Sequence, residues 1–121
     1  RRSWYRLPLQ MFLTEYVADR SCRCLATNVS PSGLHLSQLP QPGLALPDKV
    51  GLEFELPGTG EVIWAAGKVK HDLQDPYFAG TGVEFAGIAR AHQRLIRDYV
   101  LDQRERQLRS LLSTIRRNRA H

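Results

Sequence analysis

The feature that most constrains the fold is an alternation of apolar and polar residues, which recurs in short segments through the first 88 residues. The clearest case is the segment from Val50 to Leu56, in which every second residue is apolar and a glycine and two glutamates stand between them. A period of two is that of a β-strand with one buried face. The chain is therefore expected to begin with a sheet.

Several segments follow this rhythm, and no helical pattern stands between them. Strands are expected at Leu7–Tyr16, Ser21–Thr27, Leu34–Leu36, Val50–Leu56, Glu61–His71 and Tyr77–Phe85. Turn residues separate them, and we expect a bulge near Ala65–Gly67, an irregular loop over Ser37–Asp48 and Trp64 in the core. The pattern predicts an all-β fold, a six-stranded closed antiparallel barrel over residues 1–88.

Helical spacing of apolar residues begins only after this region and predicts a helix over residues 89–115, followed by a basic tail over 116–121. Its first part should pack on the barrel. Residues 102–107 carry no apolar side chain, so the later stripe from Leu108 to Ile115 needs a sister subunit, a neighbouring domain or a target protein. The alternative is a solvated helix that frays after about Arg109.

The formal net charge of +5 over 121 residues is unevenly placed. Nine arginines against three acidic residues give +6 after residue 88, so residues 1–88 carry −1. A nucleic-acid surface across the barrel is therefore not expected. The chain opens with arginine and not methionine, so we expect a domain cut from a longer polypeptide, cytoplasmic itself and with a membrane anchor elsewhere as one alternative.

The two cysteines, Cys22 and Cys24, lie two residues apart and share one face of a strand. A disulfide between them would be strained, so reduced thiols are expected. Zinc binding together with His35 or His71 matches no usual ligand spacing, and no metal site is predicted.

Polar turn chemistry interrupts the strands at Asn28-Val29-Ser30-Pro31-Ser32-Gly33. Proline presets one backbone angle, and Gly33 can take positive φ. Asn28 and Ser30 are expected to point the same way and offer an amide and a hydroxyl. By itself, such a turn is also compatible with an ordinary strand connection.

Arginines Arg1, Arg2 and Arg6 cluster at the start of the chain, around Ser3-Trp4-Tyr5. A guanidinium group can donate two hydrogen bonds to phosphate oxygens or to the O6 and N7 atoms of guanine, and it can stack on a base. An arginine cluster beside an amide-and-hydroxyl turn would suit a guanine nucleotide phosphodiester.

Together these segments resemble the PilZ domain, a bacterial receptor family for cyclic di-GMP. The family pattern is Arg-x-x-x-Arg followed about twenty residues later by Asp/Asn-x-Ser-x-x-Gly, and Arg2–Arg6 and Asn28–Gly33 match it. Gly82-Val83-Glu84-Phe85 before a helix also resembles the end of a PilZ barrel. The resemblance covers roughly residues 1–105 and implies a PilZ-type barrel.

The resemblance also implies the binding residues. Arg2 and Arg6 would grip the phosphates and guanine edges, with Arg1 adding to the cluster. Asn28 would meet a guanine edge where the family more often has Asp, Ser30 would offer a hydroxyl, and Gly33 would keep the turn open.

Two further residues are candidates for contact with a base. Trp4 would cover a guanine or anchor the N-terminal arm, and His71 would lie flat under a base or stand as an ordinary exposed histidine at a strand end. Neither role follows from the pattern alone.

The implied function is a cyclic di-GMP receptor whose ligand orders the arginine arm, and an effector protein or fused domain reads the change. The alternatives are a PilZ-like interaction or oligomerisation module without ligand binding, and a nucleic-acid binder that uses the basic tail. No catalytic motif, cofactor motif or phosphate loop is present in the sequence, so an enzyme is not expected.

Overall fold

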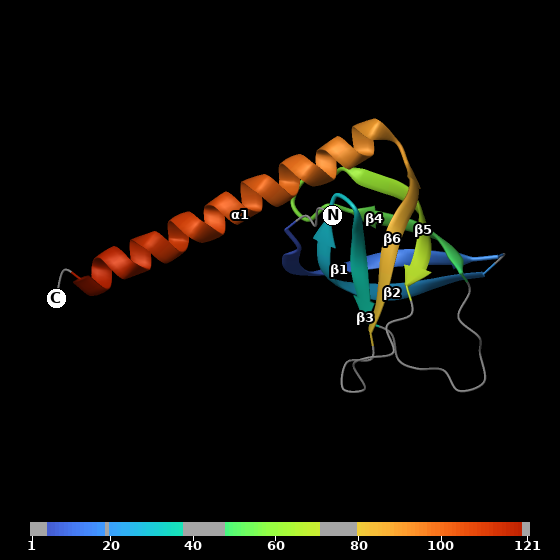
Figure 1. The fold of residues 1–121 in the computed structure, drawn as a ribbon, viewed down its shortest axis with the longest axis horizontal. Coiled ribbons are helices and arrows are strands. Elements are labelled where there is room, and N and C mark those ends of the chain that lie inside the picture. The colour runs from blue at the N-terminus through green and yellow to red at the C-terminus, as the bar shows by residue number, and fades with distance from the viewer. Residues whose placement is uncertain (1–4, 19, 38–47, 71–79, 120–121) are drawn as a thin grey trace.

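The computed structural model describes residues 5–18, 20–37, 48–70 and 80–119, which form six strands and one long helix (Figure 1). In chain order these elements are β1 (Leu7–Val17), β2 (Arg20–Ser30), β3 (Gly33–Ser37), β4 (Lys49–Glu55), β5 (Val62–Lys70), β6 (Gly80–Ile88) and α1 (Arg90–Arg119).

The strands form one closed antiparallel barrel in the order β1-β2-β3-β6-β5-β4. Pairing of β1 with β4, for example Leu13 with Phe54, closes the ring. The predicted fold class is therefore confirmed. The expected start of the last strand at Tyr77 lies outside the described residues, whose last strand begins at Gly80.

The core lies inside this ring and is built by the alternation seen in the sequence. Val50, Leu52, Phe54 and Leu56 are all buried, as predicted. Trp64, in contrast, is 61% exposed, so its expected place in the core was wrong. On β5 the inward positions are the odd-numbered ones, such as Ile63 and Ala65, and residue 64 therefore points outward.

The predicted bulge on β5 is present, because the register with β6 shifts between Ala66 and Gly67. A side chain at position 67 would overlap the Cγ1 methyl of Val83, so a glycine is needed where β5 and β6 approach closely.

Helix α1 packs on the barrel only through its first part, where Ile96 and Val100 are buried and contact is made with β1 and β2. From Arg104 to Arg119 every residue is exposed, and Figure 1 shows this part projecting beyond the barrel. Exposed ion pairs four residues apart, such as Arg109 with Glu105 at 2.6 Å, support the helix modestly.

The helix does not fray near Arg109, and it continues past residue 115. The prediction of a basic tail over residues 116–121 is therefore corrected, because Arg116, Arg117 and Arg119 lie in the last helical turn. Positive side chains at this end interact favourably with the helix dipole. Among the described residues, no helix has the length and apolar character needed to cross a membrane.

Candidate functional site

Arg6 and Asn28 meet at one end of the barrel, as the sequence predicted. Antiparallel pairing of Leu7 with Val29 and of Pro8 with Asn28 brings the start of β1 beside the end of β2, although Arg6 and Asn28 are 22 residues apart in the chain. Arg6 Nη1 donates a hydrogen bond to Asn28 Oδ1 at 3.3 Å on the exposed surface. This bond is long and open to solvent, so both groups can exchange it for a ligand.

The turn after β2 is tighter than the sequence indicated, because Ser30 pairs with Gly33 and leaves only Pro31 and Ser32 between them. Ser30 is 0% exposed. Its hydroxyl lies 3.0 Å from Ser32 Oγ and 3.3 Å from the Gly33 carbonyl oxygen, and it accepts a bond from the Ser32 amide at 3.2 Å. Ser30 therefore shapes the turn, and exposed Ser32 presents the hydroxyl that was expected from Ser30.

Gly33 is required for space and not for an unusual backbone angle. Among the described glycines only Gly58 and Gly60 have positive φ, so the expected conformation of Gly33 was wrong. A Cβ at position 33 would overlap the Val83 carbonyl oxygen and lie 3.1 Å from Glu84 Cα. The glycine thus permits the close approach of β3 to β6.

A shallow polar pocket of about 320 Å³ opens beside the Arg6–Asn28 contact. Its lining comes from β2, β3, β5, β6, the turn between β2 and β3, and the residue before β1: Arg6, Asn28, Ser32, His35, Lys70, Gly82, Val83 and Glu84. Cations, an amide, a hydroxyl and a carboxylate face one space. This set can bind an anion and hydrogen-bond a nucleobase at once.

Six of the eight lining residues were not predicted as site residues, and Ser32, His35 and Lys70 are three of them. His35 Nδ1 lies 3.3 Å from Thr27 Oγ1, which orients the ring. Lys70 Nζ lies 3.7 Å from Glu84 Oε2 in an exposed pair that leaves the ammonium accessible to a ligand. The resemblance pattern contains none of the three.

A second hollow of about 490 Å³ differs in chemistry. It is lined by Tyr16, Gly51, Leu52, Trp64, Ala65, Ala66, Gly87, Ile88 and Ala89. No charged side chain lines it, so it does not suit a ligand with two phosphates.

Helix α1 touches both halves of the polar site. Gln93 Nε2 donates to the Pro31 carbonyl oxygen in the turn at 3.1 Å. Tyr5, next to Arg6, lies under the Arg104 guanidinium at 4.9 Å from the ring centroid, and its hydroxyl donates to Gln107 Oε1 at 3.4 Å. The turn after β2 and the residue before Arg6 are thus both in contact with the helix.

Four predicted site residues, Arg1, Arg2, Trp4 and His71, lie outside the described residues. Their places at the site remain predictions. Of the predicted site residues, the described part of the chain places Arg6 and Asn28 at the pocket and Ser30 and Gly33 in the turn beside it.

Residues 1–102 match the PilZ domain family. Among solved structures, the chain is similar to the Bacillus subtilis inhibitor of motility MotI/DgrA, with a TM-score of 0.72 and 20% identity, over 88% of this chain and 52% of that one. It is also similar to the Borreliella burgdorferi PlzA protein in complex with c-di-GMP, with a TM-score of 0.53 and 17% identity, over 83% of this chain and 41% of that one. The chain thus spans about half the length of these structures or less. No curated protein matches its sequence.

Proposed function

Because this chain belongs to the PilZ domain family, we propose that it is a cyclic di-GMP receptor that converts ligand binding into a change read by a partner. The observation that carries the proposal is the contact of Arg6 with Asn28 at the mouth of a polar pocket. These residues belong to the two motifs that resemble the family pattern. The structure of PlzA, solved in complex with c-di-GMP, shares the fold and adds support.

The ligand carries two phosphates and two guanines, which suits the groups at this end of the barrel. Arg6 donates to phosphate oxygens or to the O6 and N7 edge of guanine, and Arg1 and Arg2 add further guanidinium groups from the same segment. Asn28 meets a guanine edge through its amide. Ser32 and His35 complete the rim in our proposal.

Trp4 and His71 have secondary roles in this proposal. Trp4 covers one guanine face because aromatic side chains stack on bases, and His71, which follows β5, lies under a base. Loss of either is expected to weaken binding less than loss of an arginine, since neither can form the forked, charge-assisted hydrogen bonds of a guanidinium group.

Binding orders the arginine arm, residues 1–6, against the barrel. Like charges in the arm repel one another, and the ligand phosphates neutralise them. Charge-assisted hydrogen bonds to the phosphates offset the free-energy cost of ordering the arm. Tyr5 lies within this arm and contacts Arg104 and Gln107. Closure of the arm therefore changes the position of α1 on the barrel. An effector protein or a fused domain in the bacterial cytoplasm recognises this change.

Calorimetric titration of the purified chain with cyclic di-GMP tests the proposal. The intact chain should bind at micromolar ligand or below. Arg6→Ala should weaken binding roughly a hundredfold, as expected for losing about 2–3 kcal/mol of charged hydrogen bonds. Arg2→Ala should weaken it comparably.

Arg20→Ala is the matched control, because this exposed arginine begins β2 at the opposite end of the barrel. It removes the same charge and should leave affinity within about twofold, the small effect expected of a distant surface charge. Absence of binding at micromolar ligand, or equal losses in the Arg6 and Arg20 variants, would refute the receptor assignment.

The exposed apolar residues of α1 favour a second candidate function, an interaction or oligomerisation module. Leu108, Leu111, Leu112 and Ile115 lie on the projecting part of the helix, at a spacing typical of a helical stripe. A mass measurement in solution decides whether this stripe pairs copies. If the chain is a monomer and does not bind cyclic di-GMP, the remaining function is that of a module that binds another protein through this stripe.

A further inference from the structure

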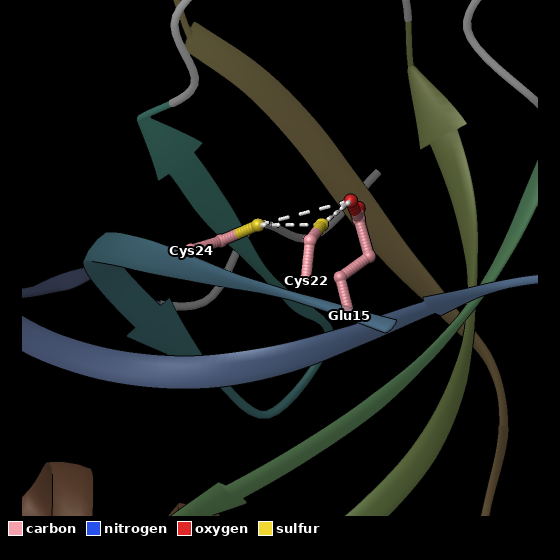
Figure 2. A group of neighbouring side chains, drawn as sticks. All are labelled: Glu15, Cys22 and Cys24. Atoms are coloured by element: carbon pink, nitrogen blue, oxygen red, sulfur yellow. Dashed lines mark hydrogen bonds between the residues drawn. The ribbon is translucent and has the colours of Figure 1, made fainter. Parts of the chain in front are cut away.

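A second cluster of reactive side chains lies at the other end of the β1–β2 pair. Glu15 on β1 pairs directly with Cys22 on β2, and Cys24, two residues further along, faces the same side. Figure 2 shows the carboxylate of Glu15 reaching toward both thiols. The register of the strands therefore brings three potential metal ligands together.

The spacing of their donor atoms matches one face of a tetrahedral zinc site. The two sulfur atoms are 3.8 Å apart, and Glu15 Oε1 lies 3.6 Å from Cys22 Sγ and 3.7 Å from Cys24 Sγ. Zinc with bonds of about 2.3 Å to sulfur and about 2.0–2.2 Å to oxygen places two sulfurs about 3.8 Å apart and a sulfur and an oxygen about 3.6 Å apart. Little movement is needed to admit the ion.

Burial and ligand type both favour a metal of this kind. Glu15 is 6% exposed and Cys24 7% exposed, whereas Cys22 is exposed and leaves a route from solvent. Two soft thiolates select zinc or copper(I) over magnesium or calcium, and a carboxylate ligand favours zinc of the two.

We propose that Glu15, Cys22 and Cys24 bind one zinc ion, with the fourth position open to water. On binding, each thiol transfers its proton to solvent as its Zn–S bond forms, so two protons leave for each metal bound. The site does not depend on cyclic di-GMP. Cys22 and Asn28 stand six positions apart on β2, or about 20 Å at a strand rise of ~3.3 Å per residue.

Oxidation of the same two thiols is the competing chemistry. A disulfide needs a sulfur–sulfur bond of about 2.05 Å, so the pair would have to close from 3.8 Å across neighbouring positions of one strand face. Such a bond would be strained and easily reduced, whereas the present spacing needs no closure to hold zinc.

The test uses the full chain, reduced and freed of metal with a chelator, and then titrated with zinc or with cobalt(II) as a spectroscopic probe. We expect one equivalent to bind, two protons to be released, and cobalt(II) to show thiolate charge-transfer absorption. Loss of a residue that only supports a metal ligand weakens metal binding by up to about a hundredfold. Cys22→Ser removes a ligand itself and should therefore weaken zinc binding by at least this factor. Because Cys22 is exposed, this variant should fold, and circular dichroism verifies that it does.

Glu15→Gln and Glu55→Gln form a matched pair, since Glu55 is an exposed carboxylate on β4 outside the cluster. The first should lose affinity roughly tenfold or more, and the second should not change it. Zinc should raise the melting temperature of the intact chain and of Glu55→Gln, but not of Cys22→Ser. Equal zinc affinity in the intact chain and in Cys22→Ser, or cobalt(II) binding without thiolate absorption, would overturn the proposal. So would recovery of the freshly reduced chain as the disulfide in the presence of zinc.

Discussion

The two ends of the β1–β2 pair carry groups of opposite character on one continuous ladder. At the end near Arg6 and Asn28 the groups are exposed, cationic or hydrogen-bonding, and they touch α1 through Tyr5 and Gln93. At the end near Glu15 the groups are soft or acidic, and two of the three are buried. Our proposals assign ligand exchange and signal transmission to the first end and ion binding to the second.

This difference follows from the face on which each side chain lies. Glu15, Cys22 and Cys24 lie on the face of their strands that turns toward the barrel interior, with Leu13 and Ala26 on the same faces. Arg6 stands just outside β1 and is exposed to solvent. The same ladder therefore gives a confined site at one end and an open site at the other, and each should respond separately to substitution.

The largest expected effect tests the backbone that supports the open end. Gly33→Ala forces a Cβ against the Val83 carbonyl oxygen, so β3 and β6 must move apart. We expect a loss of about 3 kcal/mol in the free energy of unfolding, the upper range for overpacking. Urea denaturation measures it. Gly87→Ala is the control, because its Cβ would lie 3.6 Å from Ala66 Cβ in ordinary contact, and equal losses in both variants would contradict the close-approach account.

The next effect separates charge from geometry at Arg6. Arg6→Lys retains the positive charge but loses the planar fork that binds two oxygens, so affinity for cyclic di-GMP should fall about thirtyfold, or about 2 kcal/mol. Calorimetry measures the loss, and zinc affinity at the other end should stay unchanged. An unchanged nucleotide affinity would mean that Arg6 acts only as a point charge.

The smallest expected effect concerns Asn28. Asn28→Asp supplies a carboxylate that can accept from N1–H and N2–H of guanine together, and affinity should rise about fivefold, or about 1 kcal/mol. Asn28→Ala, measured in the same titration, should lower affinity. A weaker Asp variant would indicate that residue 28 serves mainly to hold Arg6, because a carboxylate would then bind that guanidinium more firmly.

The strand period, a property of neighbouring residues, predicted the barrel, and the resemblance to the PilZ pattern predicted the meeting of Arg6 with Asn28. They failed where the register between strands decides the outcome. Ser30 was expected at the rim, but its pairing with Gly33 makes the turn one of two residues and turns Ser32 outward. Trp64 was expected inside, but the odd-numbered residues of β5 take the inner face.

Residues brought together by closure of the barrel were harder still to predict. His35 and Lys70 reach one pocket because β3 and β5 both flank β6. The local sequence does not predict this strand order. Glu15 was likewise missed beside the cysteines, where His35 and His71 were considered instead. Only the hairpin register, which pairs Glu15 with Cys22, reveals it.

The projecting part of α1 makes the helix a lever. From Leu101 to Arg119 the helix extends about 28 Å at ~1.5 Å per residue, while its base is held by Ile96 and Val100. A tilt of about 10° at that base would displace the far end by about 5 Å by the same geometry. A shift too small to reorganise the barrel is thus magnified at the tip, where the exposed leucines stand.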